Sequence, residues 1–387
     1  MTGAITNARI LTPDESFEPG TLIWGDDGRI AAVAQELEPP PGLGVTDAHG
    51  LTLVPGYIDI HVHGGGGLSL ATADPEEIQS YARWVVSHGV TGFLATVFAS
   101  GLEEALALVS AAGYVSDRRL DGGAEVLGIN LEGPFINPKR KGALPDAWVR
   151  TPRPDELAAL SNASDGSIKV MTLAPEVSGA EELMQLALKD WIVVAVGHSD
   201  ATYEEAQRAF DLGASHLTHA FNGMRSFHHR DPGPVFAAFE APHVTLEVIA
   251  DGIHLHPATV RAMVRAAGPG RIALISDGVR PAGLDDGVFQ LGDEQASLTR
   301  GRVQLPDGTI AGGAETMDHI VRNVVSWEVA GLADAVRMAS TVPARVLGLS
   351  EEKGRLAVGY DADIIALDNE SNVAMTWVGG RLVYKRA

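Results

Sequence analysis

The stretch PGYIDIHVHGG, residues 55–65, contains the pattern that decides the fold. Its apolar run YIDIHV is typical of a buried strand in a parallel sheet, and the glycines after it indicate a turn. Side chains two positions apart on a strand lie on the same face, so His61 and His63 can point at one position. Functional residues of parallel barrels gather at the C-terminal ends of the strands. The pattern therefore predicts a strand that ends in a functional site.

Seven more apolar runs follow, and the intervals between them leave room for helices. Connecting segments such as DPEEIQSYARWVVSHG have apolar residues at helical spacing and acidic first turns. Eight strands alternating with helices favour an α/β fold of the (β/α)8 TIM-barrel type, and a doubly wound open sheet is the alternative. The seven runs are TGFLATV (91–97), EVLGINL (125–131), SIKVMTL (167–173), WIVVAVG (191–197), ASHLTH (214–219), VTLEVIA (244–250) and RIALIS (271–276).

The two ends of the chain have a different texture, in which short β-prone runs alternate with turns. GTLIWGDDGRIAAVAQ near the start and NVAMTWVGGRLVYKRA at the end are examples. We expect these runs to pair, and the sequence therefore predicts two domains. Residues 1–54 and 355–387 would form a small β-sandwich domain, and residues 55–354 would form the barrel domain.

Composition narrows both the chemistry and the partners. The 387 residues include 50 acidic against 29 basic side chains, a net charge of −21, and no cysteine. Without cysteine, histidines and carboxylates remain to bind a metal. The negative field disfavours nucleic acid and anionic membranes as partners, and an anionic substrate would need cationic groups beside it. The sequence contains no recognisable secretion signal or membrane-length apolar run, so we expect a cytoplasmic location.

Candidate metal ligands stand at the ends of five predicted strands. Imidazole and carboxylate suit divalent first-row metals, with zinc as the first candidate and iron or another such metal as the alternative. One such residue alone would indicate little, but a set that meets on one rim predicts a metal site. The set is His61, His63, Glu132, His198, His219 and Asp277.

Together with these residues, longer motifs give the chain a specific resemblance. The motifs are PGYIDIHVHGG, LEGPFINPKRKGA, GHSDAT, LTHAFNGM, RDPG and ADGIH. In them the chain resembles the amidohydrolase superfamily and, within it, the N-acetylglucosamine-6-phosphate deacetylases, over nearly its whole length. The resemblance implies a metal-dependent hydrolase that removes the acetyl group from this phosphorylated amino sugar and releases acetate.

The resemblance also implies how the ligands are shared. Glu132, His198 and His219 would hold one ion, and His61 and His63 would hold a second ion beside it, with Glu132 bridging the two. Some relatives lack the first histidine pair and work with one ion. This sequence retains both imidazoles, which predicts two ions per subunit.

Roles in catalysis and phosphate binding follow from the same resemblance. Asp277 would take a proton from the attacking water and deliver it to the departing amine. Arg230, His254 and the backbone around Asn222 and Gly223 would bind the phosphate. In relatives the arginine reaches across from a neighbouring subunit, so a homodimer with shared sites is expected.

Contacts to the sugar are the least specific part of the resemblance. Relatives usually have a histidine where this sequence has Leu144, and Arg280 and Gly223 also differ from the common family residues. These departures leave the sugar open, with N-acetylgalactosamine 6-phosphate as the alternative substrate. The backbone of Ala143 and a loop bordering the sugar are expected to touch the substrate; this loop consists of Ile310, Ala311 and Gly312.

Two other functions are compatible with a barrel of this kind. One is another amidohydrolase acting on a small amide, which the LEGP and RDPG motifs and the missing strand-four lysine disfavour. The other is a noncatalytic barrel used for binding, which would be expected to have lost metal ligands. This sequence retains all of them.

Overall fold

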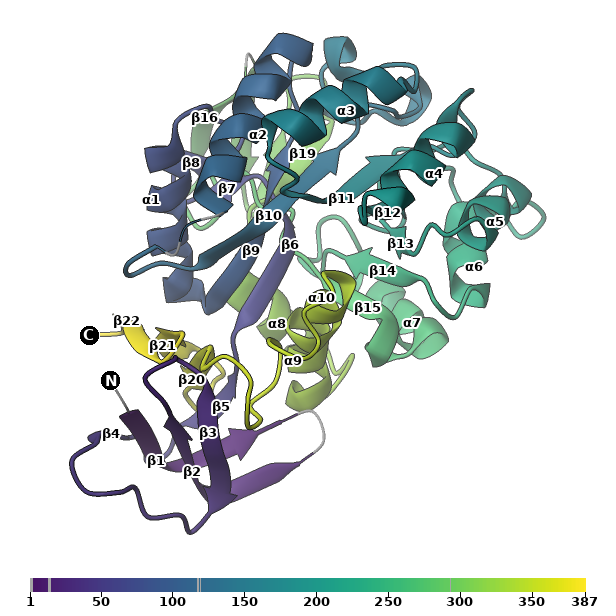
Figure 1. Ribbon diagram of the computed structural model, residues 1–387. Coiled ribbons are helices and arrows are strands. Elements are labelled where there is room, and N and C mark those ends of the chain that lie inside the picture. The colour runs from purple at the N-terminus through teal and green to yellow at the C-terminus, as the bar shows by residue number, and fades with distance from the viewer. Residues whose placement is uncertain (1–2, 13–14, 117, 119, 293) are drawn as a thin grey trace.

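The computed structural model describes residues 3–12, 15–116, 118, 120–292 and 294–387. The chain forms a barrel of parallel strands surrounded by helices, with a small sheet from both termini packed beside it (Figure 1). The barrel strands, in chain order and in spatial order, are β6 (Tyr57–Val62), β9 (Val90–Val97), β10 (Glu125–Glu132), β11 (Ile168–Leu173), β12 (Val193–Val196), β13 (His216–Leu217), β14 (Thr245–Val248) and β15 (Ile272–Leu274).

The strand order excludes the doubly wound alternative. Neighbours in the sheet are neighbours in the chain throughout, whereas a doubly wound sheet reverses its order at a switch point. The first and last strands meet just beyond β15. There Asp277 N donates to His61 O at 3.0 Å, and His63 N donates to Gly278 O at 2.7 Å. The predicted barrel is therefore confirmed, and it closes at the end where the strand-end residues lie.

Each barrel strand is followed by a helix or a helical segment, as the sequence pattern predicts. An acidic first turn begins several of them, for example Glu204 and Glu205 at the start of α5, where Thr202 also caps the helix. The helices are α1 (Pro75–Val85), α2 (Leu102–Ser116), α3 (Pro154–Ala163), α4 (Ala180–Lys189), α5 (Tyr203–Asp211), α6 (Gly233–Glu240), α7 (Pro257–Ala267), α8 (Met317–Ser326), α9 (Leu332–Ala339) and α10 (Thr341–Val346).

The barrel interior is a packed core rather than a channel. Side chains that point inward from alternate positions, such as Ile58, Ile60 and Ile275, form one apolar cluster. Val342 and Ala344 of α10 belong to the same cluster. Ligands can therefore enter at the C-terminal ends of the strands.

The two chain ends do pair, as predicted, in one hydrogen-bonded mixed sheet with its own apolar core. Gly56 alone separates strand β5 of this sheet from barrel strand β6. The exact limits 1–54, 55–354 and 355–387 stay a prediction. The strands of the terminal sheet are β1 (Gly3–Leu11), β2 (Ser16–Trp24), β3 (Ile30–Gln35), β4 (Gly44–Asp47), β5 (Thr52–Pro55), β20 (Ile364–Leu367), β21 (Val373–Val378) and β22 (Arg381–Lys385).

A four-stranded antiparallel sheet between β15 and α8 was not predicted from the sequence. It packs on the barrel through a small apolar cluster that includes Val279, Leu298 and Val303. The expectation that residues 310–312 form a loop is wrong, because these residues belong to the last strand of this sheet. The strands are β16 (Gly287–Leu291), β17 (Glu294–Thr299), β18 (Arg302–Gln304) and β19 (Ile310–Gly313).

Among the described residues, no helix has the length and apolar character needed to cross a membrane.

Candidate active site

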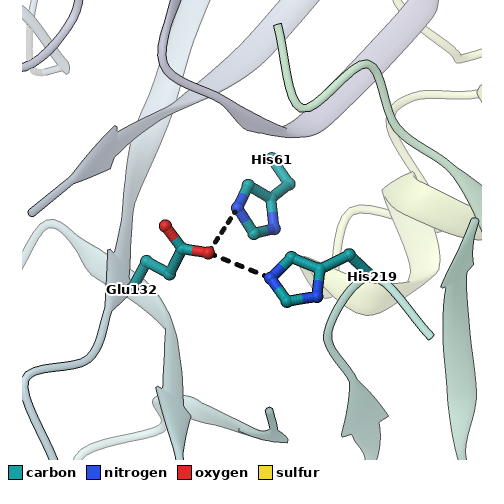
Figure 2. Close-up of side chains that lie close together, drawn as sticks. All are labelled: His61, Glu132 and His219. Carbon is teal, nitrogen blue, oxygen red and sulfur yellow. Dashed lines mark hydrogen bonds and ion pairs between the residues drawn. The ribbon is translucent and has the colours of Figure 1, made fainter. Parts of the chain in front are cut away.

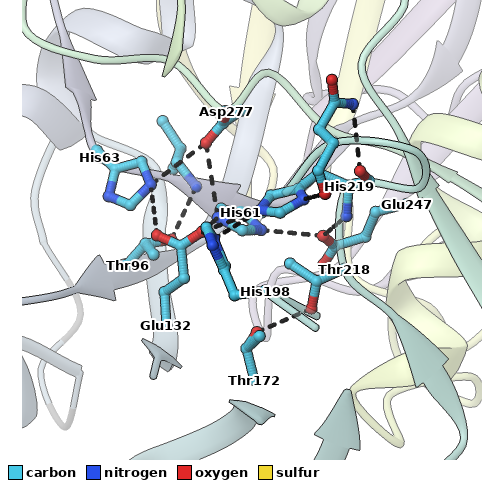
Figure 3. A network of polar contacts seen from close by, with 12 residues as sticks. His61, His63, Thr96, Glu132, Thr172, His198, Thr218, His219, Glu247 and Asp277 are labelled. Atoms are coloured by element: carbon cyan, nitrogen blue, oxygen red, sulfur yellow. Dashed lines mark hydrogen bonds and ion pairs between the residues drawn. The ribbon is translucent and has the colours of Figure 1, made fainter. Parts of the chain in front are cut away.

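The strand ends place six predicted ligands on one rim of the barrel (Figure 3). His61 belongs to β6, and His63 follows that strand directly. Glu132 is the last residue of β10, and His198, His219 and Asp277 lie a few residues beyond β12, β13 and β15. All six side chains are buried. Residues up to 216 positions apart in the chain thus meet because parallel strands end at the same edge.

The carboxylate of Glu132 is at the centre of this cluster. Its Oε1 lies 3.0 Å from His198 Nε2, 3.1 Å from His219 Nε2 and 3.3 Å from His61 Nε2. Figure 2 shows the last two of these contacts. The other oxygen, Oε2, lies 3.3 Å from His63 Nε2. One carboxylate therefore faces four imidazoles.

Asp277 closes the cluster on the side of β6. Its Oδ1 lies 3.3 Å from His63 Nε2 and 3.6 Å from His61 Nε2. Burial alone would raise the pKa of Asp277, but the hydrogen bond with His63 and the charge of His61 lower it below the ordinary value. The carboxyl group is therefore ionised at neutral pH.

The donor set fits a divalent metal ion. Ligands around a tetrahedral ion at about 2.0–2.1 Å lie roughly 3.3 Å from one another, close to the separations around Glu132. His61 Nε2 is buried and makes no hydrogen bond with any described residue. Two groups of three ligand atoms are each mutually close enough to share an ion: His61, Glu132 and His219, and His61, His63 and Asp277.

Electrostatics also indicate a place for positive charge. Burial would raise the pKa of Glu132, but the charge of His61 and hydrogen bonds from His198 and His219 hold it well below its ordinary value. Burial would lower the pKa of His63, but its hydrogen bonds with Asp277 and Glu132 raise it to about 9. Protonated imidazoles thus supply the positive charge that neutralises the carboxylates. A bound metal cation would supply positive charge at the same place.

The outer nitrogens of three imidazoles are anchored, which turns their inner nitrogens toward Glu132. His198 Nδ1 lies 2.7 Å from the carbonyl oxygen of Arg140, and His219 Nδ1 lies 3.2 Å from that of Asn222. His61 Nδ1 lies 2.9 Å from Glu247 Oε2. Such partners fix both the ring orientation and the nitrogen that faces a metal.

The backbone at three of the ligands is held in an unusual conformation. The φ angles are +46° at His198, +24° at His219 and +48° at Asp277. Residues other than glycine rarely adopt positive φ, and such positions cluster at functional sites. The barrel core and the anchored rings hold the backbone in this conformation, which lowers the local stability at these three residues.

A cavity of about 790 Å³ opens above the cluster. Glu132, His63, His198, His219 and Asp277 line its floor. Its walls also contain seven of the eight residues expected to touch the substrate, namely Ala143, Asn222, Gly223, His254, Ile310, Ala311 and Gly312. Leu144 and Arg280, two of the departures from the family pattern, line it as well.

Arg230, the eighth of these residues, lies outside the described lining of the cavity. It is exposed in the connection between β13 and α6, where its guanidinium lies 2.8 Å from His229 Nε2. A single chain therefore does not bring this arginine to its own site.

Two local features keep the cavity in shape. Asp251 Oδ1 accepts hydrogen bonds from the backbone of Ile253 and His254, and its Oδ2 lies 2.6 Å from His254 Nδ1. The Asp251 turn therefore aims the imidazole of His254 at the cavity. Gly223 has a φ of +57°, and a Cβ there would lie 3.1 Å from His198 Nδ1. A larger residue would press on the His198 ring.

Two buried carboxylates beside the cluster were not singled out from the sequence. Glu247 interrupts the apolar run VTLEVIA, and Asp59 interrupts YIDIHV. Asp59 Oδ2 accepts from Ser276 Oγ at 2.5 Å, which ties β6 to the residue before Asp277. A charged residue inside an otherwise apolar strand is the signal that could have identified both, because a buried charge needs specific partners.

Comparison with known proteins agrees with this geometry. Residues 52–383 match the Amidohydrolase family. N-acetylglucosamine-6-phosphate deacetylase of Vibrio furnissii is 38% identical over 98% of this chain and 91% of its own length. N-acetylgalactosamine-6-phosphate deacetylase of Escherichia coli O157:H7 is 36% identical over 99% of both chains. The D267A mutant of N-acetyl-D-glucosamine-6-phosphate deacetylase from Mycobacterium smegmatis, solved with N-acetyl-D-glucosamine-6-phosphate, superimposes with a TM-score of 0.92 at 34% identity over 99% of this chain and 100% of its own.

The chain therefore belongs to the amidohydrolase family. The three relatives named above are deacetylases of N-acetylated amino sugar 6-phosphates, the class that the sequence motifs predicted.

Proposed function

We propose that this chain hydrolyses the N-acetyl group of N-acetylglucosamine 6-phosphate to give glucosamine 6-phosphate and acetate. The observation that carries the proposal is the ionised carboxylate of Asp277 next to a metal-type cluster on the floor of a sugar-sized cavity. Similarity over the whole chain to deacetylases of this substrate supports it. The cytoplasm remains the predicted location of the reaction.

The mechanism assigns the proton transfers to Asp277. Glu132 and the histidines around it would hold a divalent ion, which when bound would lower the pKa of a water molecule and polarise the acetyl carbonyl. Asp277 accepts the proton of the attacking water and passes it to the nitrogen of the departing amine. Asp277 lies on the cavity floor beside His63, where its carboxylate can reach both the attacking water and the amine. His254, held by Asp251 through Nδ1, borders the same space, and its protonated form can donate a hydrogen bond from Nε2 to the substrate.

We propose two ions, with zinc as the first candidate. The first ion position is formed by Glu132, His198 and His219, and the second ion position by His61 and His63, with Glu132 reaching both. The contacts of Glu132 Oε1 with His198 and His219, and of Oε2 with His63, support this division, and His61, 3.3 Å from Oε1, lies between the two positions. Asp277, which contacts both residues of the second position, would complete its coordination.

We propose that the phosphate is bound partly by a second copy of the chain. The net charge of −21 repels an anionic substrate, so local cations have to overcome it. His254 and the backbone at Asn222 and Gly223 line the cavity of the same chain. Arg230 is exposed and is not among the described residues that line its own cavity, which fits a residue that serves the neighbouring site of a homodimer.

Replacing Arg230 tests this arrangement. Arg230→Ala should raise KM for N-acetylglucosamine 6-phosphate while leaving the slow hydrolysis of plain N-acetylglucosamine unchanged, because the guanidinium fork matches phosphate oxygens. Steady-state kinetics on both substrates measure the difference. Equal effects on the two sugars would remove Arg230 from phosphate binding.

A second candidate substrate is N-acetylgalactosamine 6-phosphate. The relative from Escherichia coli O157:H7 is a deacetylase of that sugar by name, and it is 36% identical to this chain, against 38% for the relative from Vibrio furnissii. Leu144 and Arg280 lie in the cavity wall, where they can change the contacts to sugar hydroxyls.

Acetate release by metal-loaded protein tests the function directly. The panel contains both N-acetylated hexosamine 6-phosphates, their unphosphorylated forms and a cyclic amide, with metal-stripped protein as the control. We expect the glucosamine phosphate to have the highest kcat/KM and the stripped protein to be inactive. Preference for the galactosamine phosphate would select the alternative substrate, and activity on the cyclic amide alone would reject the proposal.

A further inference from the structure

Glu247 is a buried carboxylate that touches several parts of the cluster without facing the cavity. It lies on β14 and is 1% exposed. Its Oε2 lies 2.9 Å from His61 Nδ1 and accepts a hydrogen bond from the backbone N–H of His219 at 2.9 Å. Its Oε1 lies 3.0 Å from His216 Nε2. One side chain thus connects strand β6 with the end of strand β13.

The outer partner of His61 differs in kind from those of the other two anchored rings. His198 and His219 each lie against a neutral backbone carbonyl. His61 lies against a carboxylate, which can only accept hydrogen bonds when ionised, so Nδ1 must carry the proton and Nε2 faces the cluster. A carboxylate partner also makes an imidazole a stronger metal ligand.

We propose that Glu247 is a positioning residue that controls how tightly the second ion position binds its metal. The inference rests on the two-ion function proposed above. The ring of His61 is held by Glu247, whereas the ring of His219 is held by Asn222 O and needs Glu247 for its backbone N–H. Loss of the negative charge at position 247 should therefore weaken the second ion position and spare the first.

Zinc titration of metal-stripped protein tests the proposal. The wild type should bind two Zn²⁺ per chain. Glu247→Gln keeps the size and one acceptor oxygen but removes the charge. It should lower the affinity of the second ion position by about 10- to 100-fold, the effect usual for such partners. The first ion position should keep its affinity, so that elemental analysis after dialysis finds one zinc per chain.

A matched control is available in the same barrel interior. Thr172 Oγ1 and Thr218 Oγ1 form a buried hydrogen bond of 2.8 Å (Figure 3). Thr172→Val removes this bond without altering the contacts of Glu247. It should lower stability by about 1 kcal/mol and leave both zinc affinities at their wild-type values. Selective zinc loss in Glu247→Gln but not in Thr172→Val separates positioning from general damage to the barrel.

A double variant gives a second check. His61→Asn removes the ligand on which Glu247 is proposed to act, so it should also leave one zinc per chain. Adding Glu247→Gln to His61→Asn should change the remaining affinity little. A further large loss would mean that Glu247 acts through another ligand and would overturn the proposal.

Other results of the zinc titration would reject the proposed role of Glu247. Two zinc ions bound with wild-type affinity by Glu247→Gln, or equal weakening of both sites, would overturn the role of Glu247 and leave the deacetylase function intact. A wild type that takes up a single zinc would remove the second ion position and this inference together. If Glu247→Gln does not fold, Glu247→Asp keeps the charge but withdraws it from His61. The same selective loss is expected there, and unchanged binding would reject the proposal.

Discussion

The two ends of strand β10 each carry a glutamate in a buried or half-buried charged cluster, and the clusters differ in one respect. At the start, Glu125 lies 2.7 Å from Lys353 Nζ, which also contacts Asp361 at 2.8 Å and Asp363 at 2.9 Å. At the end, Glu132 faces four imidazoles. An ammonium group has three N–H donors, and here it meets three carboxylates, so the first cluster is complete.

In the cluster around Glu132, at the other end of β10, the donors and acceptors do not match one to one. Its inner nitrogens face one another as well as Glu132, with 3.1 Å between His198 Nε2 and His219 Nε2. His61 Nε2 finds no hydrogen-bond partner among the described residues. Buried charge alone therefore does not identify a ligand site. Here the unmatched atom belongs to a group of metal-ligating side chains, and a bound ion would complete it.

The largest effect should come from the carboxylate that faces the substrate. Asp277→Asn should lower kcat by about 10²- to 10⁴-fold, because an amide cannot transfer the proton. The fold and the zinc at the first ion position should be retained. Acetate-release kinetics together with metal analysis measure this, and near-normal turnover would reject Asp277 as the proton carrier.

The complete cluster should show the opposite behaviour, with a large effect on stability and none on metal. Lys353→Met leaves the three carboxylates without their cation, and burial already raises the pKa of Asp363 despite the pull of Lys353. We expect a loss of about 3–5 kcal/mol in the free energy of unfolding and unchanged zinc content. Denaturant titration and elemental analysis measure the two quantities.

A double variant and a pH series sharpen this prediction. Adding Asp363→Asn to Lys353→Met removes one uncompensated charge and should recover part of the loss. Burial would lower the pKa of Lys353, but Asp363, Glu125 and Asp361 raise it. A raised lysine pKa stabilises the fold fully below the ordinary value of about 10.4. The loss in free energy of unfolding should therefore be the same at pH 7 and pH 9. A loss of zinc in Lys353→Met would show that the two clusters are not independent.

The smallest effect is expected at Asp318 on α8, a third buried acid with matched partners. It contacts His88 Nδ1 at 3.1 Å, Thr316 Oγ1 at 2.6 Å and Arg322 at 2.8 Å. Burial would raise the pKa of Asp318, but these partners lower it below the ordinary value. Asp318→Asn should therefore cost about 1–2 kcal/mol at pH 7.

The pH dependence of this variant tests whether the ionised carboxylate of Asp318 stabilises the fold. A depressed carboxyl pKa stabilises the fold above the ordinary value of about 4, and the contribution is lost as the pH falls through the lower, folded value. The difference between wild type and Asp318→Asn should therefore shrink below pH 4 in thermal melts. A difference that stays constant down to pH 2 would show that the charge is not what stabilises this contact.

The barrel could be predicted because its strands depend on local patterns. Each of the eight apolar runs contains a strand, including the two-residue strand β13 in ASHLTH. The convergence of Glu132 with His198 could also be expected, since parallel strands end on one rim. The catalytic and binding roles of these residues stay predictions.

Other features depend on contacts that no local pattern specifies. Strands β16 to β19 are short and half-exposed, so their sequence lacks the apolar runs that mark the barrel strands. Glu247 meets His61 across 186 positions of the chain, a pairing set by the closure of the barrel. The positive φ angles at His198, His219 and Asp277 follow from tertiary packing rather than from residue type.

The pairing of β5 with β20 has a consequence for the order of assembly during synthesis. Strand β5 continues through one glycine into the strand that carries His61, and its partner β20 begins only at Ile364. Chains emerge from the ribosome with the N-terminal segments first. Strand β5 can pair with β1 early, but its other edge stays unpaired until β20 is made. Removal of residues 364–387 would leave one edge of β5 unpaired. We expect this removal to alter the positions of His61 and His63, because β5 continues into their strand.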